Sequence, residues 1–332
     1  MKILVFAAFV TLCSGHALPT IPGDNSHYVE GESRYIWLPD DQGKPWLVDL
    51  HEPVDESVLS SRNGADNAYW LFTRQNRNNR QVIVNGQINT LRNSNFRANR
   101  PTKVIVHGWR NSGTSPMNPQ ITEAFLNIQD CNVIVVDWSR LAGNVNYNTA
   151  AAGVPSVGQH LGNFLVWVFN NMGGNWNQLH LVGFSLGAHI VGVAGRTAGR
   201  RPGRVTGLDP AGPGWGNNNN RLSNNAGNHV EAIHTDGRIA GIMNPVGDAD
   251  FYPNGGMNPQ PGCAVSTCSH GRATELFAAT VQRNHLVGRR CNNIWEAELT
   301  RCTGANLHMG NGIIGKRGAG LYGLLTGRSF PF

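Results

Sequence analysis

Short apolar runs that end in a polar residue recur along the chain from about residue 69 onward. Five of them have the length and the β-branched content of buried strands: AYWLFTR, KVIVHGW, NVIVVDW, QLHLVGF and RVTGLDP. Three segments of helical length lie between them: PQITEAFLNI, VGQHLGNFLVWVFNNM and LGAHIVGVAGRTA. Such alternation is typical of a mostly parallel sheet with helices on both faces. The pattern therefore predicts a single-domain α/β fold.

The first residues carry the pattern of a secretory signal peptide. Lys2 supplies the positive charge, Ile3 to Leu12 form the apolar stretch, and Gly15 and Ala17 are the small residues of a cleavage site. No stretch of the chain approaches the roughly 20 apolar residues that a membrane-spanning helix needs. We therefore expect residues 1–17 to be removed and the remainder to be secreted.

Residues 18–60 show no clear periodicity. Acidic residues and prolines punctuate this segment, among them Asp40, Asp41, Pro45 and Pro53. Two interpretations stay open, a linker or pro-segment ahead of the folded unit and a structured N-terminal arm. In both, the folded domain is expected to extend from residue 61 to residue 332.

The composition supports a well-packed domain. Apolar residues make up 40% of the 332 residues and charged residues only 14%, so a sizeable core is expected and disorder is not. The net charge is +6, but the basic residues are scattered and do not interleave with aromatic residues. This distribution argues against nucleic-acid binding and is compatible with a diffuse attraction to anionic lipid surfaces.

Five cysteines follow the signal segment, and four of them form two close pairs along the chain. In an oxidising compartment, these pairs predict the disulfides Cys263–Cys268 and Cys291–Cys302. A metal site is disfavoured because no CxxC spacing occurs. Cys131 is left over and precedes the apolar run NVIVVDW, so we expect a buried free thiol there.

The strongest chemical signal is the sequence GFSLG, which is centred on Ser185. An apolar strand leads into it and a helix leads out, as a nucleophile elbow requires, and the flanking glycines leave room for the tight turn. Backbone N–H groups are the usual donors to the oxyanion in such a fold. Leu186, directly after the serine, and Trp109, after the early strand KVIV, are the candidates for these donors.

A serine nucleophile needs a base, and the base needs an acid that orients it. Asp209 lies at the end of a predicted strand after the serine, and Asp236 in HTDG is the alternative acid. His270 comes last in the order Ser, Asp, His, and its flanks place it on a loop beside the first predicted disulfide. We therefore expect Ser185, Asp209 and His270 to form a catalytic triad.

The motifs HGW, DW, GFSLGAH, GLDPAGP, IHTDG, DFYPNGG and CSH, in this order, resemble the pancreatic lipase family of animals over roughly residues 65–332. The resemblance implies an α/β-hydrolase fold and a carboxylic ester hydrolase that acts on glycerolipids at a micelle or membrane surface. It assigns Ser185 as nucleophile, Asp209 as acid and His270 as base, with Trp109 and Leu186 at the oxyanion hole.

The departures from the family indicate a branch. Triacylglycerol lipases of this family carry a longer lid at the disulfide before the histidine, whereas only four residues separate Cys263 from Cys268 here. This short loop, and the short segment from Arg238 to Ala249, resemble the phospholipase A1 and galactolipase members, of insect type. We therefore expect a site that stands open in water, without interfacial activation.

The resemblance also bears on partners. The chain stops where vertebrate relatives continue into a C-terminal β-sandwich, so no colipase is expected. The segment Arg221–Ala226, where the family's calcium loop carries carboxylates, has none, so no metal and no other cofactor is expected. The alternative function is that of a catalytically silent lipid-binding or yolk-type storage protein on the same scaffold. The oligomeric state stays open.

Overall fold

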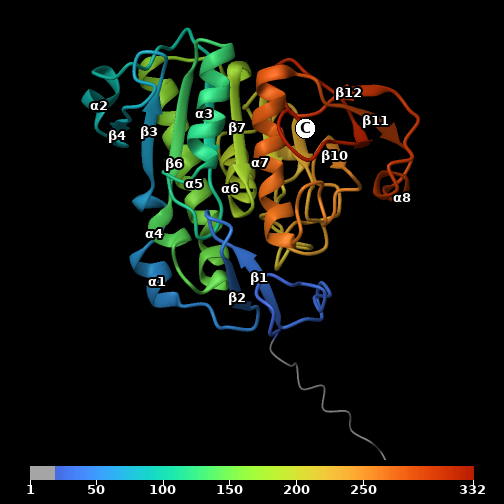
Figure 1. The fold of residues 1–332 in the computed structure, drawn as a ribbon. Coiled ribbons are helices and arrows are strands. Elements are labelled where there is room, and N and C mark those ends of the chain that lie inside the picture. The colour runs from blue at the N-terminus through green and yellow to red at the C-terminus, as the bar shows by residue number, and fades with distance from the viewer. Residues whose placement is uncertain (1–18) are drawn as a thin grey trace, which may run out of the picture.

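The computed structural model describes residues 19–332, so the predicted signal peptide lies outside the described residues. Its centre is an eleven-stranded sheet with the order β12-β11-β13-β10-β9-β8-β7-β5-β6-β3-β4 (Figure 1). The strands are β3 (Ala68–Phe72), β4 (Gln81–Ile83), β5 (Thr102–Val106), β6 (Asn132–Asp137), β7 (Leu179–Phe184), β8 (Arg204–Leu208), β9 (Val230–Ile233), β10 (Ala249–Pro253), β11 (Val287–Cys291), β12 (Asn306–His308) and β13 (Gly320–Leu324). All strands from β13 across to β6 run parallel, and the strands at both edges are antiparallel.

Helices cover both faces of this sheet. One face carries α3 (Met117–Ile128) and α7 (Ser266–Arg283), and the other carries α5 (Tyr147–Met172) and α6 (Leu186–Thr197), as Figure 1 shows. Because both faces are buried, the central strands are largely apolar, with buried polar side chains mainly near their starts. The short helices are α1 (Glu56–Ser61), α2 (Ile88–Arg92), α4 (Ser139–Ala142) and α8 (Ile294–Glu298), with 3-10 turns η1 (Gly64–Asp66), η2 (Trp176–Gln178) and η3 (Asn224–Ala226). The predicted α/β class is confirmed.

Helix α5 begins about ten residues before the helical pattern in the sequence. Its start is capped by Asn146, whose side chain accepts the N–H of Thr149 at 3.0 Å. Gly153 and Pro155 lie in its first half, and both weaken a helical pattern when only the sequence is read. Packing explains the glycine, because a Cβ at Gly153 would lie 2.1 Å from a methyl carbon of Leu141.

The N-terminal segment forms a separate two-stranded antiparallel sheet of β1 (Tyr35–Pro39) and β2 (Pro45–Asp49). This hairpin lies across the end of the main sheet at which the parallel strands finish (Figure 1). Ile36, Leu38 and Val48 are buried and belong to the same apolar core as α5 and α6. The segment that contains β1 and β2 is therefore folded against the domain.

In the part of the chain that the structure describes, no helix is long and apolar enough to cross a bilayer.

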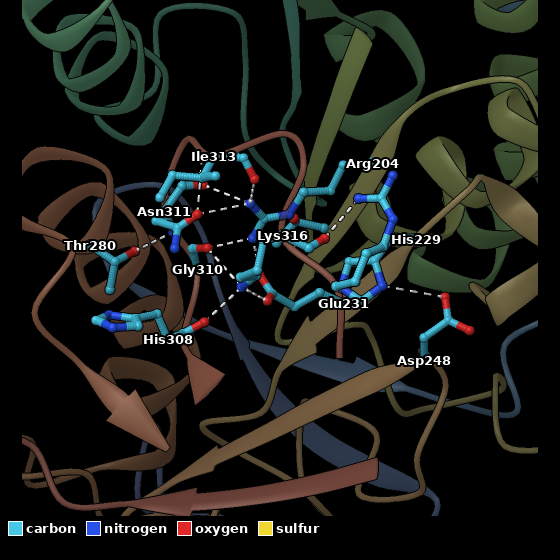
Figure 2. A network of polar contacts seen from close by, with 12 residues as sticks. Arg204, His229, Glu231, Asp248, Thr280, His308, Gly310, Asn311, Ile313 and Lys316 are labelled. Atoms are coloured by element: carbon cyan, nitrogen blue, oxygen red, sulfur yellow. Dashed lines mark hydrogen bonds and ion pairs between the residues drawn. The ribbon is translucent and has the colours of Figure 1, made fainter. Parts of the chain in front are cut away.

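A buried ionic network lies at the opposite end of the sheet (Figure 2). Arg204, at the start of β8, donates to Glu231 of β9 at 2.7 Å, and both side chains are fully buried. The ammonium of Lys316 contacts the other oxygen of Glu231, and both cations also donate to the carbonyl of Gly310. The network thus fastens the loop around Lys316 to the starts of β8 and β9, in the middle of the sheet.

One carboxylate balances two cations in this network. Burial alone would raise the pKa of Glu231, but the charges of Arg204 and Lys316 lower it. Burial lowers the pKa of Lys316 to about 7, although Glu231 opposes this shift. The network therefore depends on Glu231 as an anion.

We predict that Glu231→Gln lowers the free energy of unfolding by about 3–5 kcal/mol, because a buried pair that loses one partner leaves an uncompensated charge. Arg140→Gln is the control, since Arg140 pairs with Asp66 on the surface and exposed pairs contribute only about 0–1 kcal/mol. Urea unfolding at neutral pH measures both. The folded pKa of Glu231 is depressed, so its contribution is present above the unfolded pKa and should fade as the pH falls below about 4.5. Equal losses in the two variants would contradict the prediction.

Candidate active site

Ser185 occupies a sharp turn between β7 and α6. Its backbone has φ 55° and ψ −123°, a conformation that costs a non-glycine residue on the order of 1–3 kcal/mol. Glycines make the turn possible, because a Cβ at Gly183 would lie 2.1 Å from the carbonyl oxygen of Gly187, and one at Gly187 would lie 2.3 Å from that of Val106. The predicted strand–turn–helix context of the serine is therefore present.

Asp209 directly follows β8 and holds His270 in one orientation. Its Oδ2 accepts a hydrogen bond from Nδ1 of His270 at 2.6 Å, and its Oδ1 accepts the backbone N–H groups of Thr235 and Asp236 at 2.7 and 3.1 Å. The carboxyl group is fully buried. With Nδ1 engaged in this way, Nε2 is the nitrogen of His270 that is left for a substrate or a serine.

His270 itself lies within the first turns of α7 and not on a loop, so the predicted placement is wrong. Its neighbours in CSHG are weak helix formers, but α7 buries Ala273, Leu276 and Phe277 against the core, and this packing outweighs propensity. The disulfide Cys263–Cys268 joins the preceding loop to the first turn of the helix. It thereby fixes the start of the helix that carries His270.

The structure has a second disulfide at Cys291–Cys302. Cys131 is buried and, among residues 19–332, forms no disulfide. Burial raises the pKa of its thiol to about 11, so the reactive thiolate is disfavoured at neutral pH.

The two candidate oxyanion donors lie close to the serine. Leu186 is the first residue of α6, so its N–H belongs to the helix start that has no partner within the helix. Trp109 follows β5 and lines one cavity together with Ser185 and His270. Gly108 permits this approach, because a Cβ there would lie 2.9 Å from the Cβ of Ser185.

Asp236, the alternative acid, lies beside Asp209 but has different hydrogen-bond partners. Its Oδ2 accepts hydrogen bonds from the Ser266 hydroxyl at 2.6 Å and the Ala240 N–H at 3.1 Å, and its Oδ1 has no partner within the described residues. Burial raises its pKa well above the usual value, and the charge of Asp209 raises it further. A neutral Asp236 next to an ionised Asp209 is the arrangement that this environment favours.

Asp209, Asp236 and His270 could present three ligand atoms within 4.8 Å of one another. This set does not fit a metal ion, because the oxygens of Asp209 already accept hydrogen bonds from His270 and two backbone N–H groups. A cation there would have to displace those bonds.

The cavity at Ser185 is almost closed. It has a volume of about 10 Å³, roughly the space of one water molecule, and Ser185 is 8% exposed. Leu38 and Pro39 of β1 close it. The expected open site is therefore wrong: the loop before His270 is short, but the N-terminal hairpin covers the site instead. Hollows of about 610 and 680 Å³ lie elsewhere and include none of the triad candidates.

The segment Arg221–Ala226 surrounds a guanidinium group. Arg196, in the last turn of α6, donates to the carbonyl oxygens of Arg221 at 3.1 Å and Asn220 at 2.9 Å. It also lies 3.4 Å from the Ser223 hydroxyl and 3.5 Å from Oδ1 of Asn225. The guanidinium group of Arg196 thus occupies the oxygen-lined loop, and the loop does not fit a calcium ion beside it.

An α/β hydrolase is defined by three features of this structure: the parallel sheet, Ser185 in the sharp turn after β7, and His270 in the same cavity. The sequence profile of the Lipase family matches residues 38–315, and the chain belongs to this family.

Several curated relatives are similar to it. Lipase member H-A of Xenopus laevis is 36% identical over 248 residues, which cover 70% of this chain and 52% of that protein. Pancreatic lipase-related protein 2 of Homo sapiens is 30% identical, with 78% and 61% covered. Lipoprotein lipase of Bos taurus is 33% identical, with 64% and 50% covered. The chain spans about half the length of the first of these relatives.

We predict that Arg196 replaces a structural calcium ion. Arg196→Gln should lower the melting temperature, because loss of charged hydrogen bonds to partly buried oxygens costs about 1–3 kcal/mol, and a chelator should leave the wild type unchanged. Arg92→Gln is the control, since Arg92 is an exposed arginine in the last turn of α2. Calorimetry with and without chelator measures this. A chelator-induced drop that calcium reverses in the wild type would contradict it.

Proposed function

We propose that the chain is a carboxylic ester hydrolase of glycerolipids in which Ser185 is the nucleophile, His270 the base and Asp209 the acid that orients it. The observation that carries the proposal is the 2.6 Å hydrogen bond between Asp209 and Nδ1 of His270, in a cavity that His270 shares with Ser185. It is supported by membership of the Lipase family. A storage protein without activity would have no need for a strained serine elbow.

The chemistry follows from these positions. The Ser185 hydroxyl attacks the ester carbon while Nε2 of His270 takes its proton, and Asp209 stabilises the imidazolium that forms. The N–H groups of Leu186 and Trp109 bind the negative oxygen of the tetrahedral intermediate. His270 then returns the proton to the leaving alcohol. Water, activated by the same histidine, hydrolyses the acyl-enzyme.

For the substrate, we favour phospholipids or galactolipids over triacylglycerols. Four residues between Cys263 and Cys268 make about one helical turn, too little to present an apolar face over the site. Val265, inside this loop, is 39% exposed at the entrance to α7. A bulky polar headgroup would meet no lid helix on this side. The substrate would be reached at a micelle or membrane surface, without colipase.

We also infer secretion. The inference rests on the N-terminal pattern in the sequence together with the two disulfides, which persist in oxidising compartments.

Ser185→Ala should abolish hydrolysis of phosphatidylcholine, a galactolipid and triolein while the protein stays folded. Loss of the nucleophile of a triad lowers kcat by roughly a millionfold. Side-by-side release of fatty acid from the three substrates, with circular dichroism of the variant, tests function and preference together. Residual activity within tenfold of the wild type would refute the role of Ser185.

The two buried acids should respond differently to the same substitution. Asp209→Asn should lower kcat by roughly 10⁴, since an amide cannot stabilise the imidazolium and favours the wrong tautomer. Asp236→Asn should stay within about tenfold of the wild type, because an amide resembles a neutral carboxylic acid in shape and polarity. The hydrolysis rate of a soluble ester measures both. A larger loss at position 236 than at 209 would exchange their roles.

A further inference from the structure

The N-terminal hairpin of β1 and β2 covers the candidate active site. Leu38 and Pro39 of β1 line the cavity of Ser185 and His270, and Leu38 is 5% exposed. An acyl chain cannot enter a cavity of about 10 Å³. Hydrolysis at Ser185 therefore requires the hairpin to leave its position.

Polar contacts hold the arm on both sides of the site. On the histidine side, Asn25 donates to the hydroxyl of Ser266, the first residue of α7, at 3.3 Å. On the side of Trp109, the hydroxyl of Ser115 donates to Asp41 at 2.7 Å, and the guanidinium of Arg110 stacks 4.0 Å from the ring of Trp46. The arm thus spans the site from the base to the oxyanion donors.

All these contacts are non-covalent, and residues 19–62 contain no cysteine. A hollow of about 680 Å³ lies between the turn at Glu30 and Gly31 of the arm and the loop at Asn217, whereas Tyr28 and Leu50 at its rim pack against the main core. The arm is therefore neither cross-linked to the domain nor closely packed along its whole length.

The boundary between the arm and the domain lies at Arg62. Residues 51–57 are exposed, and α1 has no fully buried residue, although Val58 and Leu59 pack against the core. Arg62 is exposed, whereas the next residue, Asn63, caps η1. Gly64 in η1 is firmly seated, because a Cβ there would lie 2.3 Å from the carbonyl oxygen of Ser156. A chain that begins at Asn63 would keep every element of the main sheet.

We propose that residues 19–62 are an inhibitory pro-segment and that the Arg62–Asn63 peptide bond is a processing site for a trypsin-like endopeptidase. Water adds across this bond, which leaves a carboxylate on Arg62 and an ammonium group on Asn63. Arg62 is the exposed basic residue at the domain boundary. Lys44, in the turn of the hairpin, precedes a proline, which such enzymes cleave poorly.

Cleavage would open the site by turning an intramolecular contact into a bimolecular one. While the chain is intact, the short linker keeps the hairpin at an effective concentration on the order of millimolar. After cleavage and dilution, only the intrinsic affinity of the arm holds it in place. The readout of this proposal rests on the proposed esterase function at Ser185.

The test is limited trypsin digestion of the secreted chain, followed by gel filtration. A fluorophosphonate probe and a soluble ester below its aggregation threshold then report access to Ser185. We expect a chain that begins at Asn63, and labelling and hydrolysis that rise at least about tenfold, because the open fraction rises from under a tenth toward one. Arg62→Gln should block both changes, whereas Arg92→Gln, at an exposed arginine outside the arm, should block neither. Leu38→Asp should raise the labelling rate of the intact chain without protease.

Three results would overturn the proposal. The chain without residues 19–62 could be folded and yet react no faster than the intact chain. Alternatively, circular dichroism could show that this shortened chain is unfolded, which would make the arm part of the domain. Phosphatidylcholine vesicles could instead raise the rate of the intact chain as much as cleavage does, which would make the hairpin a lipid-displaced lid. Failure of the esterase function has its own signature, since neither form would then carry the probe on Ser185, and Ser185→Ala would behave like the wild type.

Discussion

A fully buried carboxylate, that of Asp209, is the group on which the candidate site depends. An isolated charge in such a place would be very costly, and here two backbone N–H groups and His270 replace the water that it has lost. Both N–H groups follow β9, directly beside the end of β8 in the parallel register. The pairing of these two strands therefore fixes the acid, the acid fixes the ring of His270, and α7 has to start where that ring can be reached.

The same charge determines the state of its neighbour. Two ionised carboxylates in one dry pocket repel each other, so burial and the charge of Asp209 raise the pKa of Asp236 well above its usual value. This asymmetry is set by partners and not by sequence position, because two N–H groups converge on Asp209 while one oxygen of Asp236 has no partner within residues 19–332. From the sequence alone, the two acids could be ranked only by their placement at a strand end and in a turn.

The parts of the structure that follow from local pattern could be predicted from the sequence. The central strands are largely apolar because both faces are buried, and Gly183 and Gly187 mark a turn that has no room for a side chain at either position. The helical position of His270 could not be predicted, since it results from packing of α7 against the sheet. The role of Arg196 could not be predicted from the sequence either, because its partners are two carbonyl oxygens and two uncharged side chains of a loop more than twenty residues away. The closure of the site could not be predicted from the sequence for a similar reason. The strands β1 and β2 have five residues each and lie among prolines and acidic residues, and their apolar side chains are buried only through contact with the domain.

The closed cavity and the strained turn at Ser185 have opposite consequences: the turn presents the serine to a substrate, and the closure keeps a substrate out. The elbow holds Ser185 in a strained backbone conformation that faces the cavity, yet Leu38 of the hairpin lines and narrows the same cavity. Removal of the hairpin would bare Trp109, Tyr147 and Phe184, all of which line the cavity. Exposed apolar area costs about 25 cal/mol per Å² in water, and an acyl chain or a lipid surface recovers this energy. An arm that shields these side chains until it is cleaved would therefore keep the uncleaved protein both inactive and soluble.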